Sequence, residues 1–313
     1  MEKKIVFALS ANRKLAKEVV KHLDCELGDI DVRHFKDGEI LVEPQETVRN
    51  RDVFIIQSTC PPVTENLMEI LIATDACKRA SARSITVVIP YYGYARQDRK
   101  ARPRQPITAK LVADMIQIAG ADRVVTLDLH APQIQGFFNI PIDDLTAVSL
   151  LGKHFHEKGF KEDLVIVSPD LGGTTRARNL ANYLHCPIAI VDKRRPYENA
   201  VEVMNIVGSV NNRIAIIVDD ICDTGGSLLA SVDMLLKKGA IEVYAAITHG
   251  VFSKPAMENI MNSKIKEIVV TDTIALKRPC KKITQISVGY MIAMTIDAIS
   301  SGNPVSEVYN KFS

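Results

Sequence analysis

The chain has 313 residues, and at about 150 residues per domain this length favours two globular domains over one. Hydrophobic residues make up 47% of the chain and charged residues 24%, an ordinary globular composition that excludes a disordered or collagen-like protein. The 39 basic and 37 acidic side chains leave a net charge of +2, so the chain as a whole is not built to bind nucleic acid.

Two further compositional features concern the cell compartment. The six cysteines show no CxxC pair and no zinc-finger spacing, which predicts reduced thiols in a cytoplasmic protein. The apolar run at residues 5–9 is too short for a secretory signal and predicts a buried strand. No stretch approaches the roughly 18 apolar residues of a membrane helix, so we expect no membrane partner.

Eight short runs of β-branched and other apolar residues recur along the chain. They span residues 5–9, 53–57, 85–89, 124–127, 164–167, 188–191, 214–218 and 243–247. Helical spacing of apolar residues occupies residues 65–80, 107–119, 174–184 and 227–238. Continuous rather than alternating hydrophobicity in the strands is typical of parallel sheets covered on both faces. The sequence therefore predicts an α/β fold, doubly wound.

A comparison within the chain suggests a duplication. Residues 113–130 aligned with residues 232–249 give six identities in eighteen positions, among them Gly120 with Gly239 and His130 with His249. The alternative is that any two helix, glycine-cap and strand units look alike. We favour duplication and predict two similar domains, 1–145 and 146–313, which pack closely because no low-complexity linker separates them.

The strongest chemical motif is the segment RIAIIVDDICDTGGS at residues 213–227. An apolar strand delivers carboxylates and then a small polar turn at the start of a helix; these residues are Asp219, Asp220, Asp223, Thr224, Gly225, Gly226 and Ser227. Backbone N–H groups and hydroxyls at such a turn suit a phosphate monoester. The paired carboxylates suit a sugar diol or a hydrated Mg²⁺. Together they predict a ribose 5-phosphate site, whereas a turn with capping aspartates is the structural alternative.

This segment resembles the phosphoribosyl-binding loop of type I phosphoribosyltransferases. The chain resembles the ribose-phosphate pyrophosphokinases of the phosphate-dependent class over nearly its whole length. The further supporting segments are FKDGE (35–39), PYYGYARQDRK (90–100), DLHAPQIQGFF (128–138), SPDLGG (168–173) and VDKRRP (191–196). The resemblance implies two similar doubly wound parallel-sheet domains of the type I phosphoribosyltransferase kind.

The resemblance also implies a nucleotide site without a Walker motif. Five basic residues within positions 96–104 lack hydrophobic periodicity, which predicts an exposed, mobile loop, and the family likeness makes it a lid whose Arg96 and Gln97 hold ATP. By the same likeness Phe35 is an adenine platform, and Asp37 and Glu39 accept hydrogen bonds from the purine. In that family this turn comes from a neighbouring subunit, so the likeness predicts a homo-oligomer, a hexamer.

The implied reaction is transfer of the β,γ-diphosphoryl group of MgATP to O1 of ribose 5-phosphate. Lys193 and Arg195 would neutralise the charge on the transferred group. His130 and Asp170 match positions that bind Mg²⁺ and contact ATP or the pentose. Each residue also has a structural alternative. His130 could be a structural histidine at the end of a strand, and Asp170 could be a helix cap. We assign no general base.

Regulation is implied by the resemblance alone. The family is activated by inorganic phosphate and inhibited by ADP at a site between subunits, and Arg49 and Arg104 match basic positions of that site. Two other functions stay open. A phosphoribosyltransferase would share the phosphate cradle but would not need the second domain or the arginine lid. A non-catalytic regulator on the same fold would be expected to have lost loop residues that this chain keeps.

Overall fold

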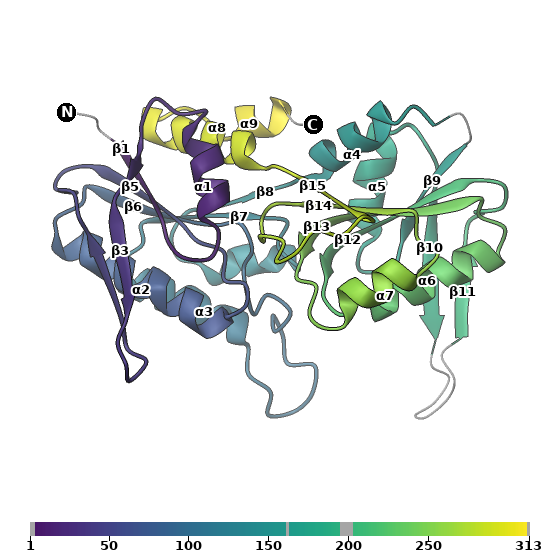
Figure 1. The fold of residues 1–313 in the computed structure, drawn as a ribbon, viewed down its shortest axis with the longest axis horizontal. Helices are drawn as coiled ribbons and strands as arrows, with labels where there is room; N and C mark the ends of the chain where they lie inside the picture. The colour runs from purple at the N-terminus through teal and green to yellow at the C-terminus, as the bar shows by residue number, and fades with distance from the viewer. Residues whose placement is uncertain (1–3, 161–162, 195–202, 312–313) are drawn as a thin grey trace. The chain divides into compact units, whose positions relative to one another are not determined.

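The structure is a computed structural model that describes residues 4–160, 163–194 and 203–311. The chain forms two compact units (Figure 1). Unit 1 comprises residues 1–146, 273–275 and 287–312, and unit 2 comprises residues 147–272 and 276–286. The chain therefore enters unit 2 after residue 146, returns briefly to unit 1 at residues 273–275, re-enters unit 2 at residues 276–286 and then returns to unit 1 at residues 287–312.

Unit 1 is built on a parallel sheet of six strands in the order β2-β1-β5-β6-β7-β8. The strands are β1 (Lys4–Ala8), β2 (Leu27–Gly28), β5 (Asp52–Ile56), β6 (Ser84–Ile89), β7 (Arg123–Leu127) and β8 (Ile142–Leu145). Figure 1 shows α2 (Val63–Arg79) and α3 (Thr108–Ala119) on one face, and α1 (Arg13–Val20), α8 (Gly289–Ser301) and α9 (Ser306–Lys311) on the other. Both faces are covered, which explains why strands such as β5 are buried at every position.

Two smaller elements complete unit 1. The antiparallel hairpin of β3 (Ile30–His34) and β4 (Ile40–Pro44) forms a two-stranded sheet of its own. The short 3₁₀ helix η1 (Pro132–Phe137) follows the turn after β7. The hairpin presents the FKDGE segment at its tip (Figure 1).

Unit 2 repeats the plan with one additional strand. Its sheet has the order β11-β10-β9-β12-β13-β14-β15, and every neighbouring pair is parallel except β10 with β11. The strands are β9 (Leu164–Ser168), β10 (Ile188–Arg194), β11 (Val203–Val207), β12 (Ile214–Cys222), β13 (Glu242–Gly250), β14 (Glu267–Thr271) and β15 (Ile283–Ile286). The helices α4 (Val148–Glu157) and α5 (Thr174–Tyr183) cover one face, and α6 (Gly226–Lys237) and α7 (Ala256–Asn262) cover the other.

The two sheets share one strand order, which agrees with the predicted pair of similar α/β domains. The strand pairing suggested by the internal alignment is wrong, however. Residues 113–130 contain β7, the fifth strand of its sheet, whereas the aligned residues 232–249 contain β13, which occupies the position of β6. A helix, a residue in the left-handed conformation and a strand follow one another at Ser81 and Gly120 in unit 1 and at Gly159, His185 and Gly239 in unit 2, so a short match selected the wrong repeat.

The boundary between the two units lies between residues 146 and 147. Residues 287–312 belong to unit 1 rather than to the second domain. The helix α8 packs on α1, with Tyr290 edge-on to His22 at 5.1 Å between ring centroids and Asp297 paired with Lys4 at 2.8 Å. Apolar periodicity shows that such a helix is buried on one face but not which face of the protein it covers.

All eight predicted strands and all four predicted helices are present. The elements that the patterns missed include α1, the β3–β4 hairpin, α4, α7, α8 and the strands β14 and β15. Within the described ranges, no helix has both the length and the apolar character needed to cross a membrane. The six cysteines all lie in those ranges, and none forms a disulfide.

Candidate functional site

The carboxyl edge of the unit 2 sheet contains a topological switch point between β9 and β12. The chain leaves β9 through α5 towards β10 on one side, and leaves β12 through α6 towards β13 on the other. Ligands of open α/β sheets bind in the crevice that opens where such connections diverge. Two segments flank this crevice: residues 168–173, which contain the predicted metal ligand Asp170, and residues 219–227, the predicted ribose 5-phosphate segment.

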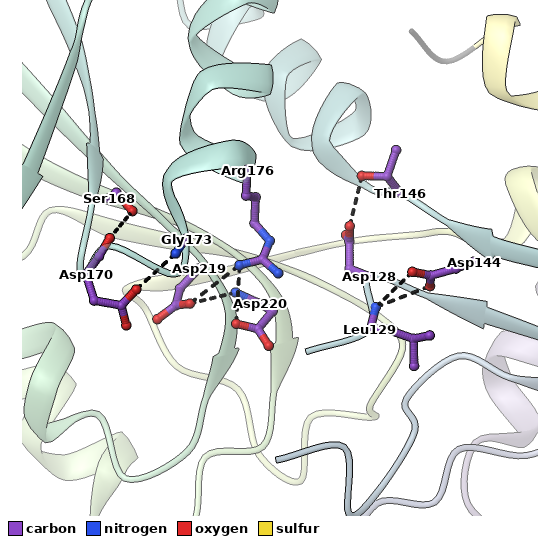
Figure 2. Close-up of polar contacts among 10 residues, drawn as sticks. All are labelled: Asp128, Leu129, Asp144, Thr146, Ser168, Asp170, Gly173, Arg176, Asp219 and Asp220. Carbon is purple, nitrogen blue, oxygen red and sulfur yellow. Dashed lines mark hydrogen bonds and ion pairs between the residues drawn. The ribbon is translucent and has the colours of Figure 1, made fainter. Parts of the chain in front are cut away.

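Two adjacent carboxylates lie beside this crevice. Asp219 and Asp220 are the sixth and seventh residues of β12, which runs to Cys222 and is longer than predicted. Arg176, in the first turn of α5, lies 3.3 Å from Asp220 Oδ1 and 3.7 Å from Asp219 Oδ1 (Figure 2). One guanidinium therefore serves both carboxylates, and it is 15% exposed.

The two carboxylates do not ionise independently. The pKa of Asp219 is raised to about 8, mainly by burial and also by the hydrogen bond and charge of Asp220, against the opposing charge of Arg176. The pair therefore carries a proton near neutral pH. A polar ligand such as a sugar diol would meet both a donor and acceptors at this position.

The turn after β12 has the features expected of an anion cradle. Gly225 has a φ of 77°, which favours glycine, and α6 begins at Gly226. A Cβ added at Gly226 would meet nothing closer than the Thr224 hydroxyl at 3.9 Å, so open space lies in front of this backbone. Thr224 and Ser227 are exposed. Backbone N–H groups, two hydroxyls and a helix N-terminus thus gather at one place.

Asp170 lies on the opposite loop of the crevice and is exposed. Its Oδ1 accepts the Gly173 N–H at 2.9 Å, and the Ser168 hydroxyl donates to its carbonyl oxygen at 2.7 Å (Figure 2). Asp170 therefore closes the loop before α5 with one carboxylate oxygen, but it does not cap the helix, whose N-cap residue is Gly173. A Cβ at Gly173 would approach Ser168 Oγ to 2.9 Å, so this loop is tightly folded.

The candidate catalytic cations are only partly described. Lys193 is the sixth residue of β10, where its backbone pairs with Met204 of β11. This places it at the carboxyl end of a strand next to β9. Arg195 lies outside the described residues.

The residues proposed for adenine recognition lie at the tip of the β3–β4 hairpin in unit 1. The turn is closed by the Phe35 N–H, which donates to the Glu39 carbonyl oxygen at 2.8 Å, and by the Glu39 N–H, which donates to Asp37 Oδ1 at 3.1 Å. The Phe35 side chain is 51% exposed. An apolar ring held out at a hairpin tip fits a surface that stacks on a flat partner.

The arginine-rich segment forms no helix or strand between β6 and α3, as predicted. Arg96 and Arg104 are exposed, and Arg104 has a φ of 67°. Gln97 is anchored at the base of the segment, where its side chain accepts a hydrogen bond from the Thr108 hydroxyl at 2.6 Å. Arg49, the other predicted regulatory residue, is exposed and donates to the Ser81 hydroxyl at 3.2 Å.

His130 ends the turn that follows β7, and its side chain is exposed. The two residues before it, Asp128 and Leu129, are buried. The histidine is therefore presented on a fixed backbone rather than on a loose loop. Its side chain belongs to unit 1, whereas Asp170 belongs to unit 2.

The corresponding crevice of unit 1, between β1 and β5, is filled by the protein itself. The Glu69 carboxylate accepts the Ser10 N–H at 3.0 Å, and Gln57 Oε1 accepts the Ala11 N–H at 2.9 Å. Gln57 also donates to Glu69 at 2.7 Å, and both side chains are 1% exposed. The Glu69 carboxylate and the Gln57 amide oxygen thus each accept one backbone N–H of the turn after β1.

The donor set constrains how a metal ion would bind. Over the residues that the structure describes, no three His, Cys, Asp or Glu side chains form a group able to hold an ion. The oxygen donors at the unit 2 edge instead fit Mg²⁺, which keeps several waters and binds through one or two carboxylates and substrate phosphates. The available residues fit such a shared site and do not fit an all-protein cage.

Arg176 is the site residue that the sequence analysis missed. It belongs to a helix that was recognised by its apolar spacing, and nothing local distinguishes it from the exposed Arg178 two residues later. Its position in the first turn after the SPDLGG loop was the available signal, because that turn faces the crevice.

The chain is similar to known proteins over nearly its whole length. A family profile described as the N-terminal domain of ribose phosphate pyrophosphokinase matches residues 4–120, and one described as a phosphoribosyl synthetase-associated domain matches residues 174–310. A ribose-phosphate pyrophosphokinase of Fusobacterium nucleatum is 53% identical over 308 residues, covering 97% of this chain and 98% of that protein. One of Bacillus caldolyticus is 56% identical, covering 97% of both chains.

The fold also matches a solved structure. The crystal structure of phosphoribosylpyrophosphate synthetase from Mycobacterium smegmatis superposes with a TM-score of 0.92 at 40% identity, covering 96% of this chain and 100% of that one. The likeness spans both units and is not confined to one motif. The chain belongs to the ribose-phosphate pyrophosphokinase family.

Proposed function

We propose that this protein transfers the β,γ-diphosphoryl group of ATP to O1 of ribose 5-phosphate, giving phosphoribosyl diphosphate and AMP. The observation that carries the proposal is the unit 2 crevice, where the Asp219–Asp220 pair lies on β12 directly before the Thr224–Ser227 cradle. An anion cradle and a diol-binding pair on one continuous segment suit the two ends of a pentose phosphate.

The pentose would lie with its phosphate on residues 223–227 and its hydroxyls at Asp219 and Asp220. Asp223 begins the cradle, and the N–H groups of Gly225, Gly226 and Ser227 would donate to the phosphate oxygens. The pentose is then fixed at both ends, which leaves O1 free to approach the nucleotide. Holding the two reactants in line supplies much of the acceleration in such a transfer.

The nucleotide would be held by residues of unit 1. Phe35 would stack on the adenine and Asp37 and Glu39 would accept its amino hydrogens, with the hairpin supplied by a neighbouring subunit. Arg96, Gln97 and His130 would contact the phosphates. The exposure of Phe35 and of Arg96 supports this assignment, because both side chains are available to a ligand.

Catalysis would depend mainly on fixed positive charge. Lys193 and Arg195 would neutralise charge that builds up on the transferred diphosphoryl group, and such neutralisation is the principal means of catalysis in phosphoryl transfer. Mg²⁺ would supply further charge neutralisation when bound, held by Asp170 and, through water or phosphate, by His130. Asp170 keeps one carboxylate oxygen outside its loop-capping bond, which is compatible with this role.

The remaining assignments concern assembly and regulation. We propose a cytoplasmic homohexamer that inorganic phosphate activates and ADP inhibits, with Arg49 and Arg104 at the regulatory site. Both arginines are exposed. Arginines in exposed loops can pair with phosphate groups bidentately, so the side chains suit either ligand.

The test is ³¹P NMR of the purified protein with MgATP, ribose 5-phosphate and inorganic phosphate. AMP and a new diphosphate ester should appear together and in equal amounts. Formation of ADP would indicate an ordinary kinase, and no turnover would indicate a non-catalytic subunit. Consumption of added phosphoribosyl diphosphate with a nucleobase would indicate a phosphoribosyltransferase.

A further inference from the structure

The turn that carries His130 is held by two side chains that follow it in the chain. Asp128 has a φ of 47°, a left-handed conformation that non-glycine residues adopt only when their surroundings fix it. The Leu129 N–H donates to the Asp144 carboxylate, 3.2 Å from Oδ1 (Figure 2). The Thr146 hydroxyl donates to Asp128 Oδ1 at 2.9 Å. The two residues before His130 are thus each bound by one of these side chains.

Asp144 is itself held by two further hydrogen bonds, and a third is made by the next residue. The Thr126 hydroxyl donates to Asp144 Oδ1 at 3.0 Å, and the Tyr309 hydroxyl of α9 donates to the Asp144 carbonyl oxygen at 2.8 Å. The Asp128 N–H donates to the carbonyl oxygen of Leu145, the residue between the two side chains, at 2.8 Å. The support is therefore a connected network rather than a single bond.

We propose that Asp144 and Thr146 are positioning residues, which act by fixing the backbone that presents His130. The inference rests on the proposed function, in which His130 contacts the nucleotide. Leu129 is only 4% exposed, so the bond from its N–H to Asp144 is sheltered from water, and His130 is the next residue. Neither positioning residue needs to touch a substrate. A displacement of about 1 Å in a positioned group can lower the rate roughly a hundredfold.

The first measurement is amide hydrogen exchange of the full-length enzyme without substrates. Asp144→Ala should increase exchange at residues 126–131, and Asp144→Asn should retain the protection, because Oδ1 of either side chain can accept both bonds. The matched control is Asp122→Ala. Asp122 also accepts a backbone N–H, that of Ile85 at 2.8 Å, but at the opposite end of β7, so exchange should rise only near residue 85.

The second measurement is steady-state kinetics with MgATP and ribose 5-phosphate. Asp144→Ala should lower kcat by about 10- to 100-fold, with KM for ribose 5-phosphate changed less than about twofold. Asp144→Asn should stay within about threefold of the parent enzyme in kcat, and so should Asp122→Ala. Thr146→Val, which removes only the hydroxyl, gives a second route to the same result and should lower kcat by about tenfold.

Three results would overturn the inference. They are a normal kcat in Asp144→Ala despite faster exchange at the turn, a loss in Asp122→Ala equal to that in Asp144→Ala, and an Asp144→Asn variant as impaired as Asp144→Ala. If Asp144→Ala does not fold, the test rests on Asp144→Asn and Thr146→Val. A normal kcat in Thr146→Val would then overturn the inference. An inactive parent enzyme would instead refute the proposed function, and the exchange data would then stand as a purely structural result.

Discussion

The guanidinium of Arg176 lies 3.3 Å from Asp220 Oδ1, and this contact joins the first turn of α5 to the end of β12. The two residues are 44 positions apart in the chain, and both are largely buried. A single cation thereby balances a pair of adjacent carboxylates at the mouth of the crevice. The charge balance at this contact and the open cradle beside it can each be tested by substitution.

Removing the positive charge should destabilise the protein. Arg176→Gln leaves the Asp219–Asp220 pair, of which Asp220 is buried, without its cation, and we expect the free energy of unfolding to fall by about 3 kcal/mol. Asp220→Asn in the same chain should recover part of the loss, because it removes the charge left unbalanced. Urea unfolding measures both effects. Arg178→Gln, at an exposed position of the same helix, should change stability by less than about 0.5 kcal/mol.

Adding a methyl group to the cradle should separate binding from stability. Gly226→Ala places a Cβ in open space in front of the turn, so we expect KM for ribose 5-phosphate to rise by about tenfold without loss of stability. Gly225→Ala should instead cost about 1 kcal/mol of stability, because φ is 77° there. An unchanged KM in Gly226→Ala would place the phosphate elsewhere.

Lys193 should matter for the rate more than for binding. Lys193→Ala removes a charge that acts on the transferred group in the transition state, so kcat should fall by at least about a hundredfold while KM for ATP changes little. Steady-state kinetics at saturating ribose 5-phosphate tests this. Lys237→Ala, at the far end of α6 from the cradle, is the control. A near-normal kcat for Lys193→Ala would remove this residue from the mechanism.

The raised pKa of Asp219 predicts how stability varies with pH. Its carboxyl has a pKa of about 8 in the folded protein and about 3.8 as the reference value, so the folded state binds the proton more tightly. The stabilisation is complete below the lower value and is lost as pH rises through the upper one. Urea unfolding of the ligand-free protein at pH 5, 6, 7 and 8 should show this decline. The slope attributable to this group should be absent in Asp219→Asn.

The filled crevice of unit 1 predicts one pentose phosphate per chain. Because Glu69 and Gln57 occupy the backbone donors of the first turn, isothermal titration with ribose 5-phosphate should give a stoichiometry of one. Glu69→Ala should lower stability by about 1–3 kcal/mol, since it removes a buried acceptor of the Gln57 amide group. A stoichiometry of two in the parent protein would contradict the assignment of unit 2 as the sugar-phosphate unit.

Much of the fold could be predicted from local patterns. Continuous apolar runs such as residues 85–89 and 214–218 identified the buried parallel strands, because a strand covered on both faces has no polar side. The DTGGS turn after β12 was equally visible, since a glycine in a left-handed conformation at a helix start leaves a distinct local signature. The catalytic cations Lys193 and Arg195 remain predictions from resemblance.

Other features depended on which segments meet in three dimensions. The return of α8 to unit 1, the contact of Arg176 with Asp220 and the support of the His130 turn by Asp144 join residues far apart in the chain. A local pattern records the face that each segment buries and the turns that it can form. Strand order and register decide which distant side chains come within hydrogen-bond distance, and these arise only when the whole sheet is assembled.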